Sequence, residues 1–169
     1  MKHFKTLLFA AILFVGTTSL ATAQSKIAHI NTTDLVQAMP EMKTAQAEIE
    51  KLTKTYEADI KTMATELQTK IKQYQSEVDT KTEEENTGRA QEVQQMEQSI
   101  RQYQGQAQQD LAKKEEALLK PIFEKAKMAI QKVAKAQGFQ YVLDSTQGGG
   151  VLVSDGKDLM ADVKKELGF

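Results

Sequence analysis

The residue types that usually perform catalysis or bind metal ions are scarce in this sequence. The chain has no cysteine and two histidines, and the second of these, His29, lies in a segment predicted to be a strand. A transition-metal site would need carboxylate ligands instead, which is an unusual choice for a tight site. No segment matches GxSxG, GxxxxGK[ST] or a GxGxxG that leads into a helix. The sequence therefore predicts no catalytic residue, no metal site and no cofactor site.

Two groups of neighbouring acids and one run of glycines remain as candidates for chemistry. Glu83-Glu84-Glu85 and Glu115-Glu116 fall on polar helix or turn surface, where no apolar surroundings would raise a carboxyl pKa for acid–base catalysis. Gly148-Gly149-Gly150 precedes a strand pattern, so it lacks the helix N-terminus that would hold a phosphate. We interpret these groups as surface charge and a flexible loop, and we do not expect an enzyme.

The N-terminal segment predicts export. Residues 1–23 carry two lysines near the start, continue through an apolar run and end in Ala21-Thr22-Ala23. This is the pattern of a secretory signal peptide, with cleavage expected after about Ala23. Its removal takes away two of the 22 basic residues and none of the 23 acidic ones, which leaves a formal net charge of −3. A mildly acidic chain lacks the basic surplus of a nucleic-acid-binding protein.

Residues 41–137 are almost entirely helix formers, and their large apolar residues form a narrow stripe. Over 49–78 these residues are spaced by three or four positions throughout, which is the period of a helix. A polar interruption at 80–89, with Asn86-Thr87-Gly88 as turn residues, separates this stripe from a second one. Two matching stripes predict an antiparallel hairpin closed along them. The stripe residues are Ile49, Leu52, Tyr56, Ile60, Met63, Leu67, Ile71, Tyr74, Val78, Val93, Met96, Ile100, Tyr103 and Leu111.

Short strand patterns lie at both ends of the predicted hairpin. KIAHI at 26–30 is the first, FQYVLD at 139–144 follows a helix end at Gly138, and VLVS at 151–154 precedes Asp158, a candidate N-cap for a last helix. Three short strands and two short helices are not expected to bury a self-sufficient core, and they leave apolar edges, so we expect a homo-oligomer joined through the strands. The residues predicted to form this oligomer body are Ile27, Ile30, Phe139, Tyr141, Val142, Leu143, Val151, Leu152 and Val153.

The expected fold class is α+β and mostly α, with a long helical hairpin inserted into a small β-strand oligomerisation body. Pro121 lies inside the returning helix, where a proline removes a hydrogen bond and bends the helix. The bend would be either a hinge at the root of the arm or a tolerated kink without a role. The predicted parts are a signal peptide at 1–23, a body at 24–40 and 138–169, and an arm at 41–137 with its turn near 80–89.

Three segments carry a resemblance to a known family. They are KIAHINTTDLVQAMPEMKTAQAEIEKL, LLKPIFEKAKMAIQKVAKAQGFQYVLD and GGGVLVSDGKDLMADVKKELG. With their order and the signal peptide, the mature chain resembles the Skp/OmpH family of periplasmic chaperones. The resemblance implies a homotrimer with a small β body and helical arms around a cavity. It also implies a periplasmic holdase that keeps unfolded outer-membrane β-barrel proteins soluble, without ATP, until they are inserted.

Two features depart from that family. Well-known members are strongly basic, whereas this mature chain is mildly acidic, so no lipopolysaccharide site is carried over and a peripheral membrane or lipid contact stays open. The tail has Met160 where the family often has a threonine. The alternative function is a structural coiled-coil spacer that binds a folded partner of the cell envelope. A holdase binds many unfolded chains, and a spacer binds one folded protein.

Overall fold

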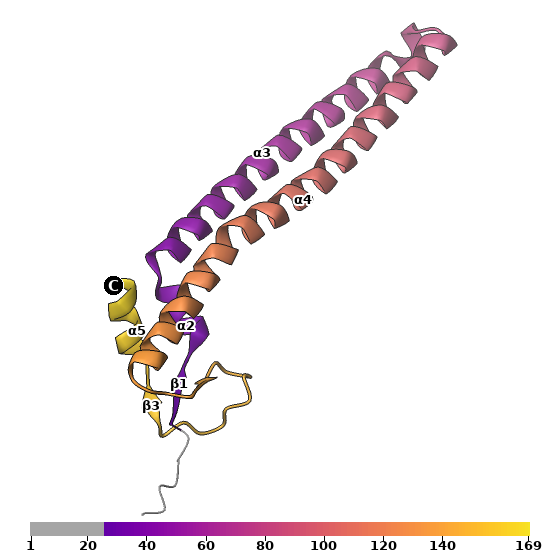
Figure 1. Cartoon of the computed structure of the whole chain (residues 1–169). Helices are drawn as coiled ribbons and strands as arrows, with labels where there is room; N and C mark the ends of the chain where they lie inside the picture. Colours follow the sequence, from indigo (N-terminus) through magenta and orange to yellow (C-terminus); the bar gives the residue numbers. More distant parts are fainter. Residues whose placement is uncertain (1–25) are drawn as a thin grey trace, which may run out of the picture.

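The structure is a computed structural model that describes residues 26–169, so the predicted signal peptide lies outside the described residues. A long antiparallel pair of helices rises from a small body of three strands and two shorter helices (Figure 1). The pair is inserted between the first strand and the other two. The predicted α+β, mostly α class is confirmed.

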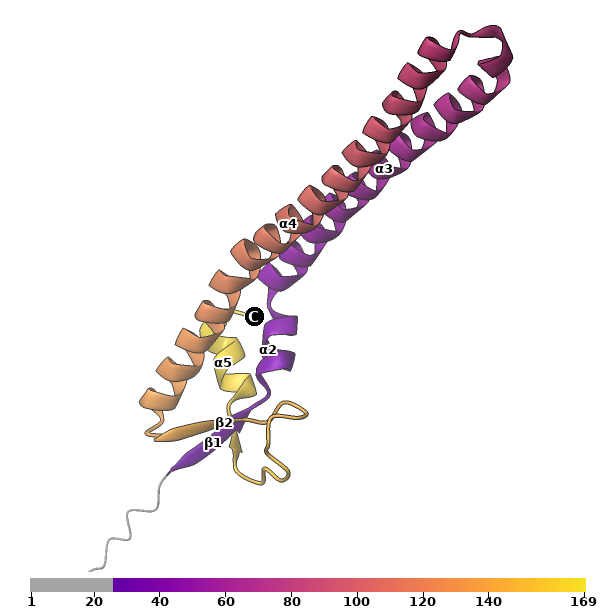
Figure 2. The same cartoon turned by 90° about the vertical axis from the view of Figure 1, so that its right-hand side faces the viewer.

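Helices α3 (Pro40–Glu77) and α4 (Glu83–Ala136) form the arm and lie side by side in both views (Figures 1 and 2). Pro40 occupies the first turn of α3, where its missing N–H leaves no hydrogen bond unmade. The 38 residues of α3, at about 1.5 Å each, extend over about 57 Å. Helix α4 has 54 residues and continues past the start of α3 into the body.

The turn at the arm tip lies earlier in the chain than predicted. A 3-10 turn, η1 (Val78–Thr80), and two further residues join the helices, so Asn86-Thr87-Gly88 lies inside α4. The side-chain amide of Asn86 donates a hydrogen bond to the Val78 carbonyl (3.0 Å). Asn86 thus serves the turn from within α4 by capping the end of α3, and not as part of the turn backbone.

A capping box fixes the start of α4. The Thr82 hydroxyl accepts a hydrogen bond from the Glu85 backbone N–H (3.2 Å), and the Glu85 carboxylate accepts one from the Thr82 N–H (2.9 Å). The bond from the Thr82 backbone, followed by that from Lys81, lowers the pKa of Glu85 to about 2. The acids at 83–85 therefore lie at a helix N-terminus, where negative charge is stabilising.

Strand β1 (Ile27–Ile30) is the centre of a three-stranded sheet, with β2 (Tyr141–Asp144) and β3 (Lys157–Asp158) parallel to it on either side. The strand predicted at 151–154 is not formed. This segment is part of an open loop between β2 and β3 (Figure 2). Both edges of β1 are taken by β2 and β3, and residues 151–154 pair with neither outer edge of the described sheet.

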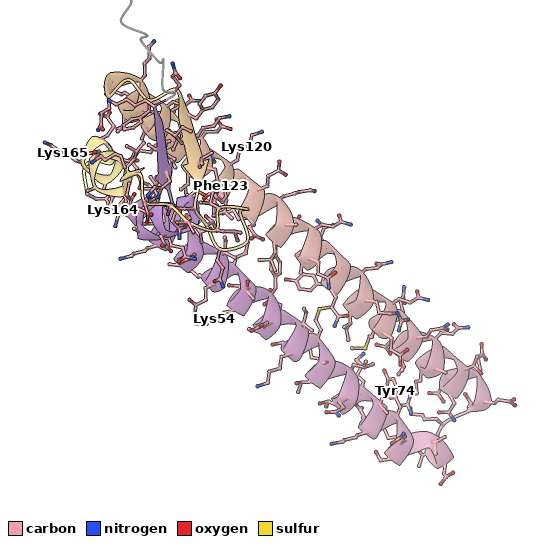
Figure 3. The ribbon with its side chains drawn as sticks, turned by 90° about the horizontal axis from the view of Figure 1, so that it is seen from below. Lys54, Tyr74, Lys120, Phe123, Lys164 and Lys165 are labelled. Carbon is pink, nitrogen blue, oxygen red and sulfur yellow. The ribbon has the colours of Figure 1, made fainter. Side chains whose placement is uncertain are left out.

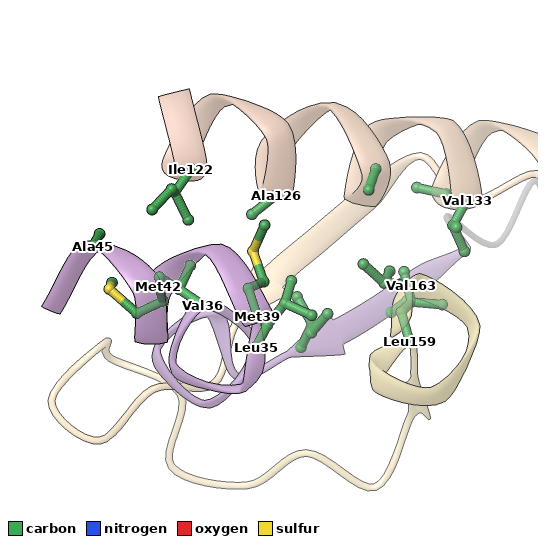
Figure 4. Packing of buried hydrophobic residues seen from close by; sticks show 14 residues of the cluster. Leu35, Val36, Met39, Met42, Ala45, Ile122, Ala126, Val133, Leu159 and Val163 are labelled. Atoms are coloured by element: carbon green, nitrogen blue, oxygen red, sulfur yellow. The ribbon is translucent and has the colours of Figure 1, made fainter. Parts of the chain in front are cut away.

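The body has a hydrophobic core of its own, so the expectation that its strands and two short helices would lack one is wrong. The core lies between β1, α2 (Thr32–Ala38), α5 (Met160–Leu167) and the last turns of α4 (Figure 4). Those turns of α4 contribute the apolar surface that the strands lack, including Ala126 and Val133. The largest fully buried side chains are Ile30, Leu35, Met39, Leu159 and Val163.

The ends of the body elements are fixed by turn and cap chemistry. Gly138 follows α4 with a φ of 74°, as a helix-ending glycine does. The Asp158 carboxylate accepts a hydrogen bond from the Met160 N–H (2.8 Å), so it serves the start of α5 from one residue before the N-cap. Both residues thus act near the helix ends that the sequence assigned to them.

Asp144, at the end of β2, joins the first and last parts of the chain. Its carboxylate accepts hydrogen bonds from the backbone N–H (3.2 Å) and hydroxyl (2.6 Å) of Thr32. It also accepts bonds from the backbone N–H (3.0 Å) and hydroxyl (2.7 Å) of Thr146. Desolvation raises the pKa of Asp144, but these bonds outweigh it and lower the pKa to about 2.

Candidate functional site

The predicted stripe lies along the seam between α3 and α4. Every stripe residue is partly buried except Val78 at the tip, which is 47 % exposed. Between residues 49 and 118 of the described chain, Ala107 alone is buried. Each large side chain is covered by one partner helix only, so the outer arm is closed without a core.

A tyrosine pair joins the helices in the inner half of the arm. The rings of Tyr56 and Tyr103 meet edge to face, with centroids 5.9 Å apart. The Tyr103 hydroxyl donates to Asp59 (2.6 Å), and the Tyr56 hydroxyl donates to Asp110 (3.4 Å). The hydrogen bond to Asp59, with desolvation, raises the pKa of Tyr103 to about 12. Both hydroxyls donate to a carboxylate of the opposite helix, so the pair fixes the register of the two helices.

A charged cluster joins the helices near the tip, where Figure 3 places Tyr74. The Tyr74 hydroxyl and Lys70 both donate to the Glu92 carboxylate, and Arg89 pairs with Glu77. The Arg89 guanidinium lies 4.6 Å from the centroid of the Tyr74 ring. The bond from Lys70, then that from Tyr74, lowers the pKa of Glu92. The tip is thus held mainly by polar contacts rather than by buried area.

Between these two clusters the seam is loosely packed. A cavity of about 300 Å³ lies there, and its apolar wall is formed by Met63, Met96 and Ile100. Methionine is flexible and fills irregular spaces, so the helices can shift against each other here at little cost. The arm therefore combines two fixed points with an adaptable stretch between them.

The charge along α4 differs between its two ends. Residues 79–111, at and behind the tip, include seven acids and three bases. Residues 112–137, at the root, include seven bases and three acids. This difference belongs to α4, because the part of α3 at the root carries acids of its own, two of which pair with Lys114 and Lys125.

Pro121 lies in α4 at the root of the arm, level with the start of α3. Helix α4 continues through it, and Pro121 lines the same surface hollow as Pro40. Lys125 pairs with Glu41 across this point. The proline thus lies where the arm leaves the body, and a hinge at this position stays a prediction.

The residues predicted for the oligomer body occupy three environments. Ile30 is buried in the core of its own chain. Phe139, Val142 and Val151 are partly buried. The remaining five, which are exposed, are Ile27, Tyr141, Leu143, Leu152 and Val153. One copy of the chain thus leaves an apolar sheet face and an apolar loop uncovered.

A hollow of about 780 Å³ lies where α4 enters the body, and sequence reasoning missed it. Its walls come from α4, β2 and α2, which are distant in the sequence. Phe123, 52 % exposed, and Lys120 lie on this part of α4 (Figure 3). The sequence signal that could have indicated this hollow is the pair of apolar residues Phe123 and Ile130, which lie on α4 and line it. We call this hollow the root groove.

Neither a metal-binding cluster nor a membrane-spanning helix is found among the described residues. Residues 26–169 contain no group of three His, Cys, Asp or Glu side chains that could hold a metal ion. Among the helices of that range, none is long and apolar enough to span a membrane. The Nε2 atom of His29 lies 3.2 Å from the carbonyl oxygen of Gly156, so the ring contacts the loop before β3. His29 thus holds this loop against β1.

The fold and the arm define an α+β protein with one coiled-coil hairpin on a small β body. The model of the OmpH-like outer membrane protein family matches residues 26–167, and the chain belongs to this family. A solved structure of an OmpH-like protein from Caulobacter crescentus, described as a candidate outer membrane chaperone, has the same fold. Its TM-score is 0.75 at 17 % identity, over 86 % of this chain and 85 % of that one. A search of curated proteins found no match.

Proposed function

We propose that this protein is a periplasmic holdase chaperone that binds unfolded outer-membrane proteins between its helical arms and prevents their aggregation without ATP. The observation that carries the proposal is the arm. It extends over about 57 Å at about 1.5 Å per residue, and only its seam is partly buried. Membership of the OmpH-like family supports the same function.

The arm surface suits weak contacts with many sequences. From Ala90 to Gln109 the chain has nine glutamines, whose side chains can accept and donate hydrogen bonds to an exposed backbone. Methionine and the aliphatic stems of lysine can contact apolar side chains without selecting one shape. The loosely packed stretch at Met63 and Met96 lets the arm bend toward clients of different size. Binding then depends on enclosure and many small contacts.

The proposed assembly is a homotrimer whose bodies join and whose arms surround a cavity. The exposed apolar residues of the sheet face and of the loop before β3 support self-association, because a second copy is the nearest source of cover. The number three comes from the family resemblance. The expected signal peptide, with cleavage after about Ala23, supports a periplasmic location.

The test is the solution mass of the mature chain, residues 24–169, measured by light scattering alone and after dilution of an unfolded outer-membrane β-barrel protein into it. We expect a trimer that becomes a soluble complex with one client. A folded soluble protein of similar size serves as the control and should not bind. A trimer that leaves the client to aggregate, but binds a folded envelope protein, would favour the spacer function. A monomer would contradict the proposed assembly.

A further inference from the structure

Two methionines meet inside the arm. Met63 of α3 and Met96 of α4 line the same cavity of about 300 Å³ in the seam, together with Ile100. Both side chains are partly buried, so each contacts the seam and is also open to water. Met96 lines a second surface hollow as well, of about 490 Å³, whose other residues belong to α3. Small molecules in solution can therefore reach the sulfur atoms of this pair, which we call the methionine joint.

The other methionines of the described chain lie in different surroundings. Met39 is fully buried and Met42 is 8 % exposed, and both belong to the closed core of the body. Met160 packs against that core from α5. Met128 is 60 % exposed on α4 and takes no part in the core. Within the described residues of the arm, only the methionine joint places accessible sulfur in the seam.

Accessible thioether sulfur is the most easily oxidised group of this chain. The chain has no cysteine that would react first. With hydrogen peroxide, one oxygen atom is transferred to the sulfur: the O–O bond breaks, an S–O bond forms and water leaves. The sulfur loses two electrons, which the peroxide gains. The product, methionine sulfoxide, is polar, and its oxygen accepts hydrogen bonds.

The cavity is poorly suited to hold a sulfoxide. Its charged lining residues, Glu66 and Glu92, carry carboxylates, which are acceptors themselves. The Ser99 hydroxyl already donates to the Gln95 carbonyl (2.9 Å). Among the lining side chains, the amide of Gln95 is the donor that remains. A sulfoxide is better solvated by water than by this lining, so it leaves the seam and its packing contacts are lost.

We propose that the methionine joint is a reversible oxidation site that opens the middle of the arm. As thioethers, Met63 and Met96 fill the seam, and as sulfoxides they leave it. The opened seam uncovers apolar neighbours that are partly buried when it is closed, such as Leu67 and Val93. Methionine sulfoxide reductases reverse the step: a dithiol supplies two electrons, the S–O bond breaks and the oxygen leaves as water.

Two contacts without sulfur limit the opening to one stretch of the arm. On the root side, the Tyr103 hydroxyl donates to Asp59 across the seam (2.6 Å). On the tip side, Lys70 pairs with Glu92. Asp59 and Lys70 are 11 positions apart on α3, which is about 17 Å at about 1.5 Å each. The helices therefore separate between these contacts while the root and the tip of the arm stay joined.

The consequence for binding rests on the proposed holdase function. An oxidised arm presents more apolar surface and bends over a wider range than a reduced one. We therefore expect the oxidised protein to keep an unfolded client soluble at a lower chaperone concentration. An oxidant that damages exported proteins would in this way raise the capacity of the protein that holds them.

Peroxide treatment of the mature chain, residues 24–169, tests the site. Peptide mass spectrometry should find added oxygen at both residues of the joint and at the exposed Met128, and little at the buried Met39. Hydrogen exchange resolved by peptide should then be about tenfold faster at 60–67 and 93–100 and unchanged in α2. Methionine sulfoxide reductases for both epimers, with dithiothreitol, should restore the original rates.

Three variants separate the joint from the other methionines. Met63→Leu combined with Met96→Leu keeps apolar side chains of similar volume that peroxide does not oxidise, so exchange should stay at the untreated rate. Met128→Leu is the matched control, because it removes an exposed methionine, and it should open like the wild type. Met63→Gln combined with Met96→Gln places polar side chains of similar length in the seam and should open it without peroxide. Helical circular dichroism checks that each variant is folded.

The outcomes separate this inference from the proposed function. Oxygen at Met128 but none at the joint would mean that the seam excludes peroxide and would overturn the inference. Full oxidation of the joint with unchanged exchange, or equal opening in the double leucine variant, would also overturn it. These measurements use no client, so the holdase function would stand in each case. A chain that holds no client in either oxidation state would contradict that function and leave the joint in place.

Discussion

Substitution of Ile71 by alanine should loosen the outer arm without destabilising the body. Ile71 is partly buried in the seam, whereas Leu35 is fully buried in the body core. The change removes three carbon atoms, each contributing about 0.8 kcal/mol when fully buried. Because Ile71 is partly buried, about two thirds or more of its surface is covered, and the expected loss is about 1.5–2 kcal/mol. Cavity formation adds little, because the seam is open to water.

The matched control is Leu35→Ala, which should cost about 2–5 kcal/mol because it leaves a cavity in a closed core. Hydrogen exchange resolved by peptide distinguishes the two variants. A loss of about 1.5–2 kcal/mol corresponds to about 10- to 30-fold faster exchange of amides in the outer arm. In Ile71→Ala the body amides should keep the wild-type rate and the urea midpoint should hardly move. In Leu35→Ala the midpoint should fall clearly.

Two results would refute this reasoning. One is an Ile71→Ala variant whose urea midpoint falls as far as that of Leu35→Ala, which would mean that the seam and the body unfold together. The other is an unchanged exchange rate in the outer arm, which would mean that the stripe does not close it. Either result would remove the physical basis for arms that bend toward a client.

Three further predictions concern groups with resolved hydrogen bonds. Asp144→Asn should lower the free energy of unfolding by about 1–2 kcal/mol at pH 7. Because the pKa of Asp144 in the folded protein is below the usual range, its contribution to the free energy of unfolding is present above about pH 4 and is lost as the pH falls toward about 2. Urea titrations of the variant should therefore lack this loss of stability at acid pH. Asp59→Asn should lower the pKa of Tyr103 from about 12, and the absorbance of tyrosinate measures this change. In the wild type the hydrogen bond from Tyr103 to Asp59 stabilises the fold fully below about pH 10, and this stabilisation is lost as the pH rises through about 12. Thr82→Ala removes a helix cap worth about 0.5–2 kcal/mol and should speed proteolysis at the arm tip.

The arm could be predicted in detail because its stripe depends on local spacing. Ile49, Ile60 and Ile71 repeat at the helical period, and each of them lies in the seam. The end of α4 at Gly138 was predictable for the same reason, since a glycine after a long apolar pattern marks a helix end. These signals need no knowledge of distant residues.

The tip was misplaced because two local signals competed. Asn86-Thr87-Gly88 has turn chemistry, but Thr82 and Glu85 have the spacing of a capping box, which fixes the start of α4 earlier. Once the helix starts at Glu83, the turn residues fall inside it. The capping box was visible in the sequence and was the more specific of the two signals.

The third strand and the root groove could not be predicted from local pattern. The segment 151–154 alternates like a strand, but alternation does not say which strand it would pair with, and in the described sheet β1 takes β2 and β3 as its neighbours instead. The groove joins residues of α2, α4 and β2 that no sequence period relates. Both features depend on topology, and topology also supplies the core that three short strands lack.

The central position of β1 has a consequence for the order of folding. Its residues are among the first to leave the ribosome, yet both of its neighbours, β2 and β3, come from the last 30 residues of the chain. The helical hairpin can form early, because its contacts need only a short turn. The body must wait until synthesis is complete, and a chain that is cut short has an arm but no sheet. Any function that needs the closed body is therefore confined to full-length chains.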